Sequence, residues 1–253
     1  MPEHGSDASE HRPLVENAGG AGPFVVVCDH ASNAIPPGLA RLGLAPGDEA
    51  SHAAWDPGAL GVARALSGAL DAPLVAAAVS RLVHDVNRPE GSAEAMPKRT
   101  ETVTIPGNAG LTMAHRAARG RRYYVPFHAA IEEVYAARPK AALVTVHSFT
   151  PVWHGTRRAV EIGIVHDSDS RLADAMLARP PAGRRAGRND PYGPEHGVTH
   201  TLRRHGVERG RLNVMLEIRN DLVADAEAEA AMGRMLAEWV AAARADLGQG
   251  AGA

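Results

Sequence analysis

The sequence of 253 residues contains a single cysteine, Cys28. One cysteine cannot form an intramolecular disulfide and cannot supply a cysteine-rich zinc module, so both kinds of scaffold are excluded. The chain is nevertheless 45% hydrophobic. That proportion is ordinary for a globular protein and is sufficient to bury a sizeable core.

The chain also lacks long apolar runs and a strong excess of charge of one sign. No apolar segment approaches the roughly 20 residues that a membrane-spanning helix needs, so no membrane partner is expected. Residues 1–13 carry neither the basic nor the apolar region of a secretory signal, which predicts a cytoplasmic protein. A formal net charge of −2 without a basic stripe predicts no nucleic-acid partner. The arginine-rich segment 179–188 is also rich in proline and glycine, and we interpret it as an exposed loop rather than an anion-binding patch.

Motifs of several common enzyme classes are absent from the sequence. No GxGxxG motif follows a strand-like segment and no Walker loop is present, so nucleotide binding has no support. The GxSxG motif of many serine hydrolases is missing as well. No HExxH helix offers two zinc ligands close together, so any metal ligands must come from separate elements.

Apolar, β-rich segments alternate with helical patterns along the chain. Alternation of this kind predicts a three-layer α/β/α domain around a mixed, mostly parallel sheet. The strand-like segments are 24–30, 73–80, 141–149, 159–167 and 213–221.

The helices that separate these segments have recognisable signals. Asp56 and Pro57 are suited to begin a helix that runs to about Leu70, with Asp56 as its N-cap. A second helix is expected from near Pro126 to residue 137, and a third is predicted by an apolar stripe of helical spacing over 232–243. We expect a flexible arm over 1–20, one catalytic domain over 21–247 and a flexible tail over 248–253.

Four strand-like segments lead into polar residues that can bind a metal or a substrate. In open α/β sheets, ligands bind at the carboxyl ends of the strands, so these residues are expected to share one cleft. A buried charge must be paired or must coordinate a metal, which argues against packing as their only role. The residues in question are Asp29-His30, Asp85-Val86-Asn87-Arg88, His147-Ser148 and Glu217-Ile218-Arg219.

His30 and His147 are the leading candidates for metal ligands. Either histidine alone could be an ordinary hydrogen-bonding residue, but two in comparable positions favour a shared metal. Catalytic zinc usually has three protein ligands, so a carboxylate or another histidine is needed, and both His52 and Asp56 are available. Asp29 is expected to point to the strand face opposite His30, which makes a shared ion improbable.

Glu217 and the Asn87-Arg88 pair each allow two interpretations. Glu217 lies in an apolar strand and either forms a buried ion pair with Arg219 or serves as a general base with a pKa raised by burial. Arg88 either pairs with an acidic loop or holds a substrate carboxylate with two hydrogen bonds.

Taken together in their order along the chain, several short motifs resemble the N-formylglutamate amidohydrolase family. The likeness covers roughly residues 24–222 and is nearest to the predicted-amidohydrolase branch of that family. The motifs are CDHASNAIP, HAAWDPGA, SRLVHDVNRP, IPGN, PFH, VHSFTP, DPY, TLRRH and LEIRNDL.

The resemblance implies a zinc-hydrolase domain of the phosphorylase/hydrolase-like type, related to metallocarboxypeptidases and zinc muramoyl amidases. It implies that Zn²⁺, or another divalent metal, is held by His30, Asp56 and His147, and that Glu217 is the catalytic base. It further implies that Asn87 and Arg88 hold a substrate carboxylate. Arg219 and His205 match family positions that face the cleft, where Arg219 would bind substrate and His205 would stabilise an oxyanion.

The expected activity is hydrolysis of a small N-acyl amino acid, with N-formyl-L-glutamate as the leading substrate. The sequence departs from the family pattern at RNDPYG (188–193) and at RND (219–221), and these departures concern the substrate more than the metal. The alternatives are a zinc peptidase or amidase acting on other small amides, and a non-catalytic protein that binds an acidic ligand. The partner is a small molecule in each case, and both a monomer and a homo-oligomer remain open.

Overall fold

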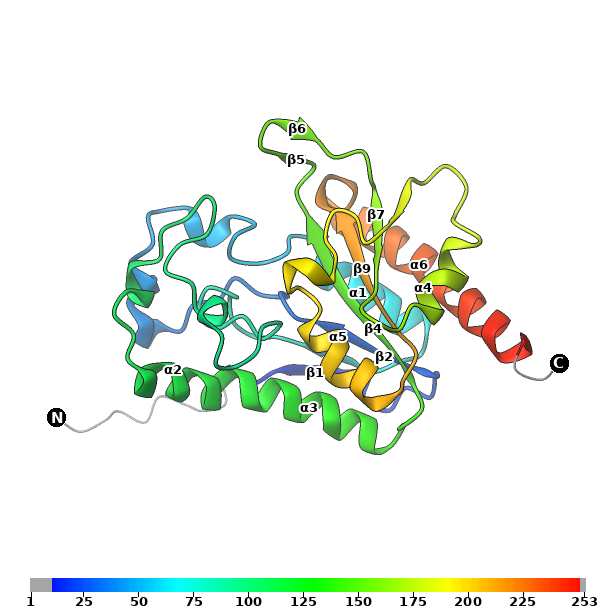
Figure 1. Cartoon of the computed structure of the whole chain (residues 1–253), viewed down its shortest axis with the longest axis horizontal. Coiled ribbons are helices and arrows are strands. Elements are labelled where there is room, and N and C mark those ends of the chain that lie inside the picture. Colours follow the sequence, from blue (N-terminus) through cyan, green and yellow to red (C-terminus); the bar gives the residue numbers. More distant parts are fainter. Residues whose placement is uncertain (1–10, 251–253) are drawn as a thin grey trace.

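A seven-stranded sheet forms the centre of the protein in a computed structural model that describes residues 11–250 (Figure 1). Its strand order is β1-β3-β2-β4-β9-β7-β8. Four neighbouring pairs are parallel, and only β1–β3 and β7–β9 are antiparallel, which confirms the predicted mixed, mostly parallel sheet. The strands are β1 (Leu14–Glu16), β2 (Phe24–Cys28), β3 (Leu74–Ala76), β4 (Ala142–Phe149), β7 (Ile162–Val165), β8 (Ala186–Arg188) and β9 (Asn213–Arg219).

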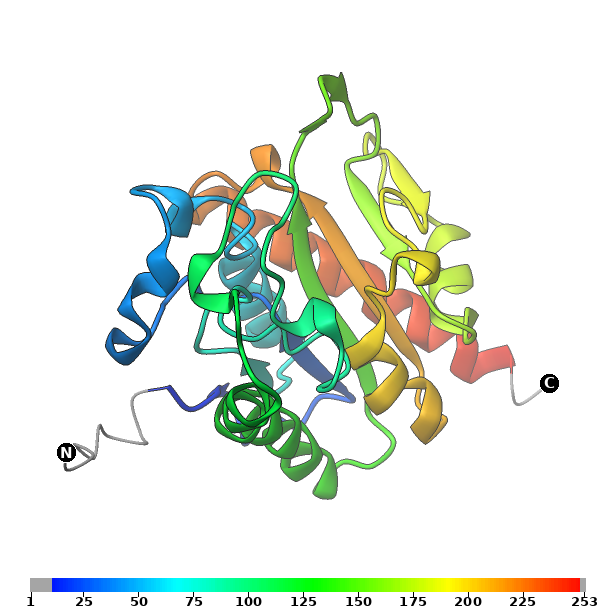
Figure 2. The same cartoon turned by 60° about the vertical axis from the view of Figure 1, so that its left-hand side comes forward.

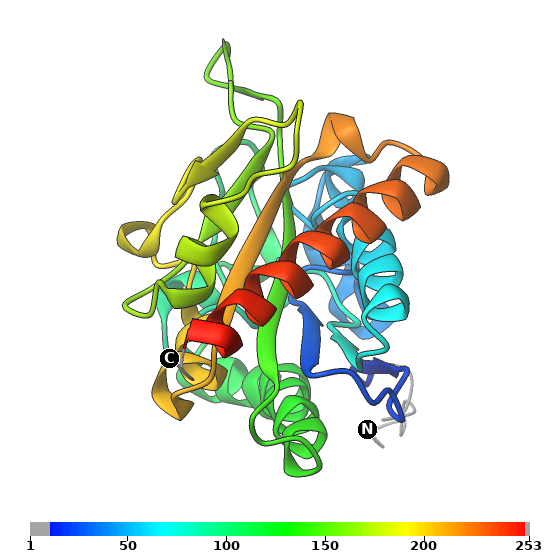
Figure 3. The same cartoon turned by 90° about the vertical axis from the view of Figure 1, so that its right-hand side faces the viewer.

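Helices cover both faces of this sheet, as a three-layer α/β/α fold requires. One face carries α1 (Ala59–Ala69), α4 (Arg171–Leu177) and α6 (Ala226–Gly250). The other face carries α3 (Val125–Ala136) and α5 (His200–His205), and α2 (Met113–Arg119) leads into α3 through a π-helical turn (Figure 2). In Figure 3, α6 runs diagonally across its face of the sheet.

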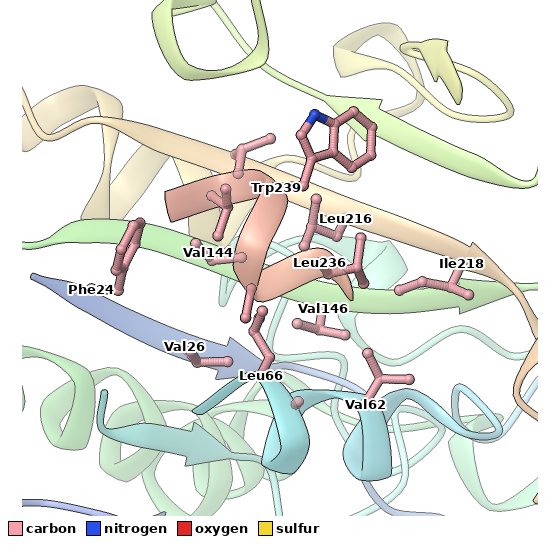
Figure 4. Packing of buried hydrophobic residues seen from close by; sticks show 14 of the residues in the cluster. Phe24, Val26, Val62, Leu66, Val144, Val146, Leu216, Ile218, Leu236 and Trp239 are labelled. Carbon is pink, nitrogen blue, oxygen red and sulfur yellow. The ribbon is translucent and has the colours of Figure 1, made fainter. Parts of the chain in front are cut away.

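The apolar residues of the central strands explain these two layers. Every residue of β2 and β9 is buried, because both faces of the sheet are covered and alternate side chains enter opposite cores. On the α6 face, Leu236 and Trp239 pack over Val144 and Leu216 in the same apolar cluster, as Figure 4 shows. The clustering confirms that the stripe over 232–243 is core.

A long irregular region between β3 and α2 lies beside the sheet and has an apolar cluster of its own. It includes Leu82, Val83 and Ile105, which pack with Leu42 and Tyr123. This cluster supports the loops that carry Arg81 and Asp85 to the carboxyl end of β2. Among the helices that the structure describes, none is long and apolar enough to cross a membrane.

The predicted start of the first helix is wrong. α1 begins at Ala59, and its N-cap is Gly58 rather than Asp56. Gly58 has a φ of 80°, and a Cβ atom there would lie 2.5 Å from Cγ2 of Val223, so the turn needs glycine. The carboxylate of Asp56 is thereby released from capping and is free for another role.

Two short edge strands also differ from the predictions. β8 occupies the last three residues of the segment 179–188 that was interpreted as a loop, and β1 lies within the predicted arm 1–20. α6 continues to Gly250, into the predicted tail 248–253. Residues 1–10 and 251–253, which the arm and tail predictions also cover, lie outside the described residues. Strands of three residues are too short to show a hydrophobic pattern, which is why the sequence did not reveal them.

Candidate metal centre and cleft

The side chains of His30, Asp56 and His147 converge at the carboxyl end of the sheet. His30 follows β2 by two residues, His147 lies within β4, and Asp56 precedes α1. Asp56 Oδ2 is 3.2 Å from Nδ1 of His30 and 2.9 Å from Nδ1 of His147. The two Nδ1 atoms are themselves 3.2 Å apart, and all three side chains are buried.

The spacing of these three atoms fits a metal ion. Zinc binds nitrogen and carboxylate oxygen at about 2.0–2.2 Å, so ligand atoms at the corners of a tetrahedron lie about 3.3 Å from one another. Each of the three observed separations is within a few tenths of an ångström of that value. Within residues 11–250, these three residues are the group of His, Cys, Asp or Glu side chains whose ligand atoms lie close enough to one another to share one metal ion. The structure thus brings together the three residues predicted as ligands, and it leaves out His52, the other candidate.

Two further carboxylates hold the histidine rings from behind. Nε2 of His30 lies 2.9 Å from Asp85 Oδ1, and Nε2 of His147 lies 3.0 Å from Asp29 Oδ2. Asp29 is itself fixed by Thr201, whose hydroxyl donates to Oδ1 at 2.6 Å. Acceptors at Nε2 favour the tautomer that leaves a lone pair on Nδ1, which is what a metal ligand requires. The contact between Asp29 and His147 was not predicted from the sequence.

The electrostatics of the triad favour a positive charge. Burial acts to lower the pKa of His147, but hydrogen bonds to Asp29 and Asp56 outweigh it and raise that pKa well above its usual value. Burial acts to raise the pKa of Asp56, yet the two neighbouring histidines hold that pKa below its usual value. A centre that stabilises protonated imidazoles in the absence of a metal is also suited to a cation.

Glu217 lies beside this centre with one oxygen unpaired. It is opposite His147 in the β4–β9 register, its side chain is buried, and its Oε2 has no hydrogen-bond partner among the described residues. Burial raises the pKa of Glu217 to about 7. The alternative ion pair with Arg219 does not form, since the guanidinium of Arg219 contacts Asp221 at 2.7 Å instead.

The triad and Glu217 open into a cavity of about 770 Å³. Six of the eight predicted site residues line it, namely His30, Asp56, Asn87, Arg88, His147 and Glu217. A cavity of this volume is in the usual range for small-molecule sites.

The expectation that His205 and Arg219 face the cleft is not met, because neither lines the cavity. His205 is on α5, which covers the face of the sheet opposite to α1 and α6. Its Nδ1 lies 3.0 Å from Glu132 and its Nε2 lies 2.7 Å from His128. Arg219 donates from Nη1 to the carbonyl oxygens of Arg158 and Val160. Both residues therefore brace neighbouring segments.

Asn87 and Arg88 line the cavity and already have protein partners. The amide of Asn87 donates to the carbonyl of Val198 at 2.6 Å and accepts from the backbone N–H of Thr201 at 2.9 Å. Arg88 donates to the carbonyl of Gly197, and its Nε lies 3.5 Å from the mostly exposed Glu94. Arg88 is thus held against an acidic loop and still contacts the cavity.

Three arginines that no sequence argument singled out also line the cavity, namely Arg81, Arg158 and the exposed Arg99. Arg81 bridges two carboxylates of the centre, with Nη1 3.6 Å from Asp56 and Nη2 3.0 Å from Asp85. Arg158 lies among aromatic rings on another wall. Arg81 stands in the quoted motif SRLVHDVNRP, but nothing in its local pattern distinguishes it from an exposed arginine.

Comparisons with known proteins show a family and a fold that this chain shares. A family model described as N-formylglutamate amidohydrolase matches residues 22–224. Among curated proteins, no match is found. The crystal structure of gene product Atu2144 from Agrobacterium tumefaciens is 51% identical, with a TM-score of 0.92 over 96% of this chain and 98% of that chain. The crystal structure of N-formylglutamate amidohydrolase from Ralstonia eutropha JMP134 is 21% identical, with a TM-score of 0.58 over 91% of this chain and 96% of that one.

Proposed function

The chain belongs to the N-formylglutamate amidohydrolase family, and from this premise we propose that it is a metal-dependent amidohydrolase that converts N-formyl-L-glutamate to L-glutamate and formate. One observation carries the proposal. The triad of His30, Asp56 and His147 opens into the same cavity as Glu217, whose buried carboxyl has an oxygen without a partner. That combination is typical of sites in which a metal and a base act on one bond.

His30, Asp56 and His147 would hold the ion, and their two imidazoles and one carboxylate suit Zn²⁺. When bound, the ion acts as a Lewis acid toward the acyl oxygen and lowers the pKa of water. Asp29 and Asp85 keep the two rings oriented through their Nε2 atoms. Arg81 balances the charge of Asp56 and Asp85 from the cavity wall.

Glu217 moves the proton in the proposed reaction. Its carboxylate accepts a proton from the attacking water at Oε2, the oxygen without a protein partner, and then delivers it to the nitrogen of the leaving amine. A pKa of about 7 suits both transfers, because a base close to the working pH can accept and release the proton with little cost.

In this proposal, Asn87 and Arg88 bind the substrate from the cavity wall. Because the Asn87 amide and the Arg88 guanidinium are tied to residues 197–201, their positions are fixed before substrate arrives. Fixed donors orient a carboxylate with a smaller loss of conformational entropy than mobile ones.

A second candidate is hydrolysis of another small amide. The cavity of about 770 Å³ has room for an acyl group larger than formyl or for a short peptide. A substrate panel therefore needs N-acetyl and N-succinyl amino acids and dipeptides beside N-formyl-L-glutamate.

The test is formate release from N-formyl-L-glutamate by the Zn²⁺-loaded protein, with Glu217→Gln as the matched variant. The variant is expected to keep its metal and to lose on the order of 10²–10⁴ in rate, the usual contribution of general acid–base catalysis. Cleavage of another amide without formate release would show that N-formyl-L-glutamate is not the substrate, while the protein would still be an amide hydrolase. Purified protein that binds glutamate derivatives but turns over none of the panel would point to the non-catalytic alternative.

A further inference from the structure

The guanidinium of Arg158 is enclosed by aromatic rings on the cavity wall. Its Cζ lies 5.4 Å from the ring centre of Phe149, 5.1 Å from that of Trp153 and 5.0 Å from that of Tyr192. The whole chain has only three phenylalanines, three tryptophans and four tyrosines. Three aromatic residues around one cation are therefore a considerable share of the total, and cation–π contacts of this geometry favour the charged group.

Arg158 has no acidic partner in the part of the chain that the structure describes. No carboxylate of that part lies within 4.0 Å of its guanidinium, although Glu101 and Asp190 line the same cavity. The other buried or half-buried arginines that line the cavity do have carboxylate partners. Arg81 is paired with two aspartates, and Arg88 is paired with Glu94. Arg158 is consequently a held cation with its charge uncompensated.

Neighbouring residues fix both ends of Arg158. Arg219 of β9 donates to its carbonyl oxygen at 3.2 Å, and the hydroxyl of Tyr192 accepts hydrogen bonds from Nη1 and Nη2 at 3.2 Å each. The hairpin of β5 (Val152–Trp153) and β6 (Thr156–Arg157), which projects beyond the sheet at the top of Figure 1, carries Trp153 and precedes Arg158. Protein contacts alone thus hold the guanidinium of Arg158 in place.

The cation also lines the same cavity as the metal centre. Phe149, which packs on Arg158, follows His147 by two residues on β4, so the two side chains are on the same face of that strand. Arg158 and the triad can therefore contact different parts of one small molecule in the cavity.

We propose that Arg158, assisted by Tyr192, is the specificity-determining group that binds the side-chain carboxylate of the substrate. The inference rests on the proposed function and refines it, because it assigns the acidic end of the substrate to one wall of the cavity. Arg158 donates the N–H groups that Tyr192 does not accept. Burial raises the pKa of Tyr192, so its hydroxyl keeps the hydrogen that it can donate to the same carboxylate.

The kinetic test compares N-formyl-L-glutamate with N-formyl-L-glutamine, which has the same shape and no side-chain charge. In Arg158→Gln, the ratio of kcat/KM for the two substrates is expected to fall 10- to 100-fold, the value of a hydrogen bond to a charged group. Arg158→Lys should retain part of the ratio. Arg88→Gln should lower kcat/KM for both substrates together, because both carry an α-carboxylate.

Arg157→Gln is the matched control, since Arg157 is adjacent in sequence, mostly exposed and paired with Asp221 away from the cavity. It is expected to leave both substrates unaffected. If Arg158→Gln lowers kcat/KM equally for both substrates, or for neither, the assignment is wrong.

A binding measurement separates this inference from the proposed function. Calorimetric titration of the metal-loaded protein with L-glutamate and L-glutamine is expected to show preference for glutamate, weakened at least 10-fold in Arg158→Gln. If the wild-type protein prefers L-glutamate and Arg158→Gln loses that preference, while no formyl substrate is hydrolysed, the proposed reaction is wrong and the carboxylate site is supported. If the wild-type protein binds the two amino acids equally, the carboxylate site fails.

Discussion

Among residues 11–250, two pairs of buried histidines contact each other, and the surroundings of the two pairs differ. In the first pair, His30 and His147, the two Nδ1 atoms are 3.2 Å apart and the rings meet edge to face at 72°. In the second, His128 and His205, Nδ1 of one lies 2.7 Å from Nε2 of the other and the rings are stacked at 18°. Burial is nearly the same for all four side chains, so burial does not separate the pairs.

The number of neighbouring carboxylates is what distinguishes the two pairs. The first pair has one carboxylate between its rings and one behind each ring, contributed by Asp56, Asp85 and Asp29. The second pair has only the half-exposed Glu132 at one end and the carbonyl oxygen of Val86 at the other. Paired histidines become a cation site where carboxylates are close enough to compensate the charge.

The pKa values express the same difference. At His30 and His147, carboxylates outweigh burial and the pKa values are raised. At His128 and His205, burial dominates and lowers the pKa values to about 3 and about 4. The second pair is therefore expected to stay neutral and to serve packing and hydrogen bonding.

The largest expected effect comes from removing one histidine of each pair. His147→Asn should reduce Zn²⁺ affinity by more than about 100-fold and abolish turnover, because even outer partners of metal ligands are worth 10- to 100-fold. His205→Asn should keep the metal and lose stability instead, since it leaves a buried hydrogen-bonding partner unsatisfied. Metal analysis and calorimetric titration of the chelator-stripped proteins measure both. Equal metal loss in the two variants would erase the distinction between the pairs.

A smaller effect is expected from the carboxylates behind the rings. Asp29→Asn and Asp85→Asn should each weaken Zn²⁺ binding 10- to 100-fold, because an amide orients the imidazole but no longer compensates its charge. Glu132→Gln, the corresponding change at the second pair, should leave Zn²⁺ affinity unaltered. Titration of each apoprotein with Zn²⁺ provides the comparison, and a Glu132→Gln protein with weakened affinity would contradict it.

The pH dependence of stability should differ in sign between Glu217 and Glu132. Burial raises the pKa of Glu217 to about 7, so the stability that its protonated form provides is complete below its unfolded pKa and is lost as pH rises through 7. The loss amounts to about 3 kcal/mol at ~1.4 kcal/mol per pKa unit. At Glu132, burial is outweighed by His205 and Arg209, which lower the pKa, so its contribution is lost as pH falls.

Denaturant unfolding of the metal-free protein between pH 4 and 9 tests this prediction. The difference in unfolding free energy between wild type and Glu217→Gln should grow in favour of the variant as pH rises. The difference between wild type and Glu132→Gln should be constant above the unfolded pKa of glutamate and should shrink only as pH falls below it. A pH-independent difference for Glu217→Gln would show that its carboxyl has an ordinary pKa.

The fold and the core of the site were largely predictable from the sequence. The continuous apolar run before His30 and the apolar residues flanking His147 predicted covered strands, and a polar residue at a strand end is expected at the ligand-binding edge. Glu217 was conspicuous in the sequence because burying a carboxyl group in an apolar strand is costly unless the group is paired. These inferences depend only on local pattern and on the rule that parallel strands share one edge.

Other parts of the site depend on contacts between distant segments. The sequence around Asp56 was consistent with a helix N-cap. Only the structure, in which Gly58 is the N-cap of α1, shows that the carboxylate of Asp56 does not cap the helix. His205 is the last residue of the family-like motif TLRRH, but which sheet face α5 covers is decided by tertiary packing. Arg158 is noticeable only once Phe149 and Tyr192, 43 positions apart in numbering, are folded around it.

The alignment of β4 with β9 places the carboxyl of Glu217 across from the ring of His147. Because side chains alternate along a strand, sliding β9 by a single residue would send that carboxyl into the opposite core. An insertion or deletion inside either strand would thus separate Glu217 from the triad of His30, Asp56 and His147, although all four residues would still be present in the sequence. Natural variation in length is therefore expected in the hairpin and the outer loops, and the spacing within these two strands should be fixed.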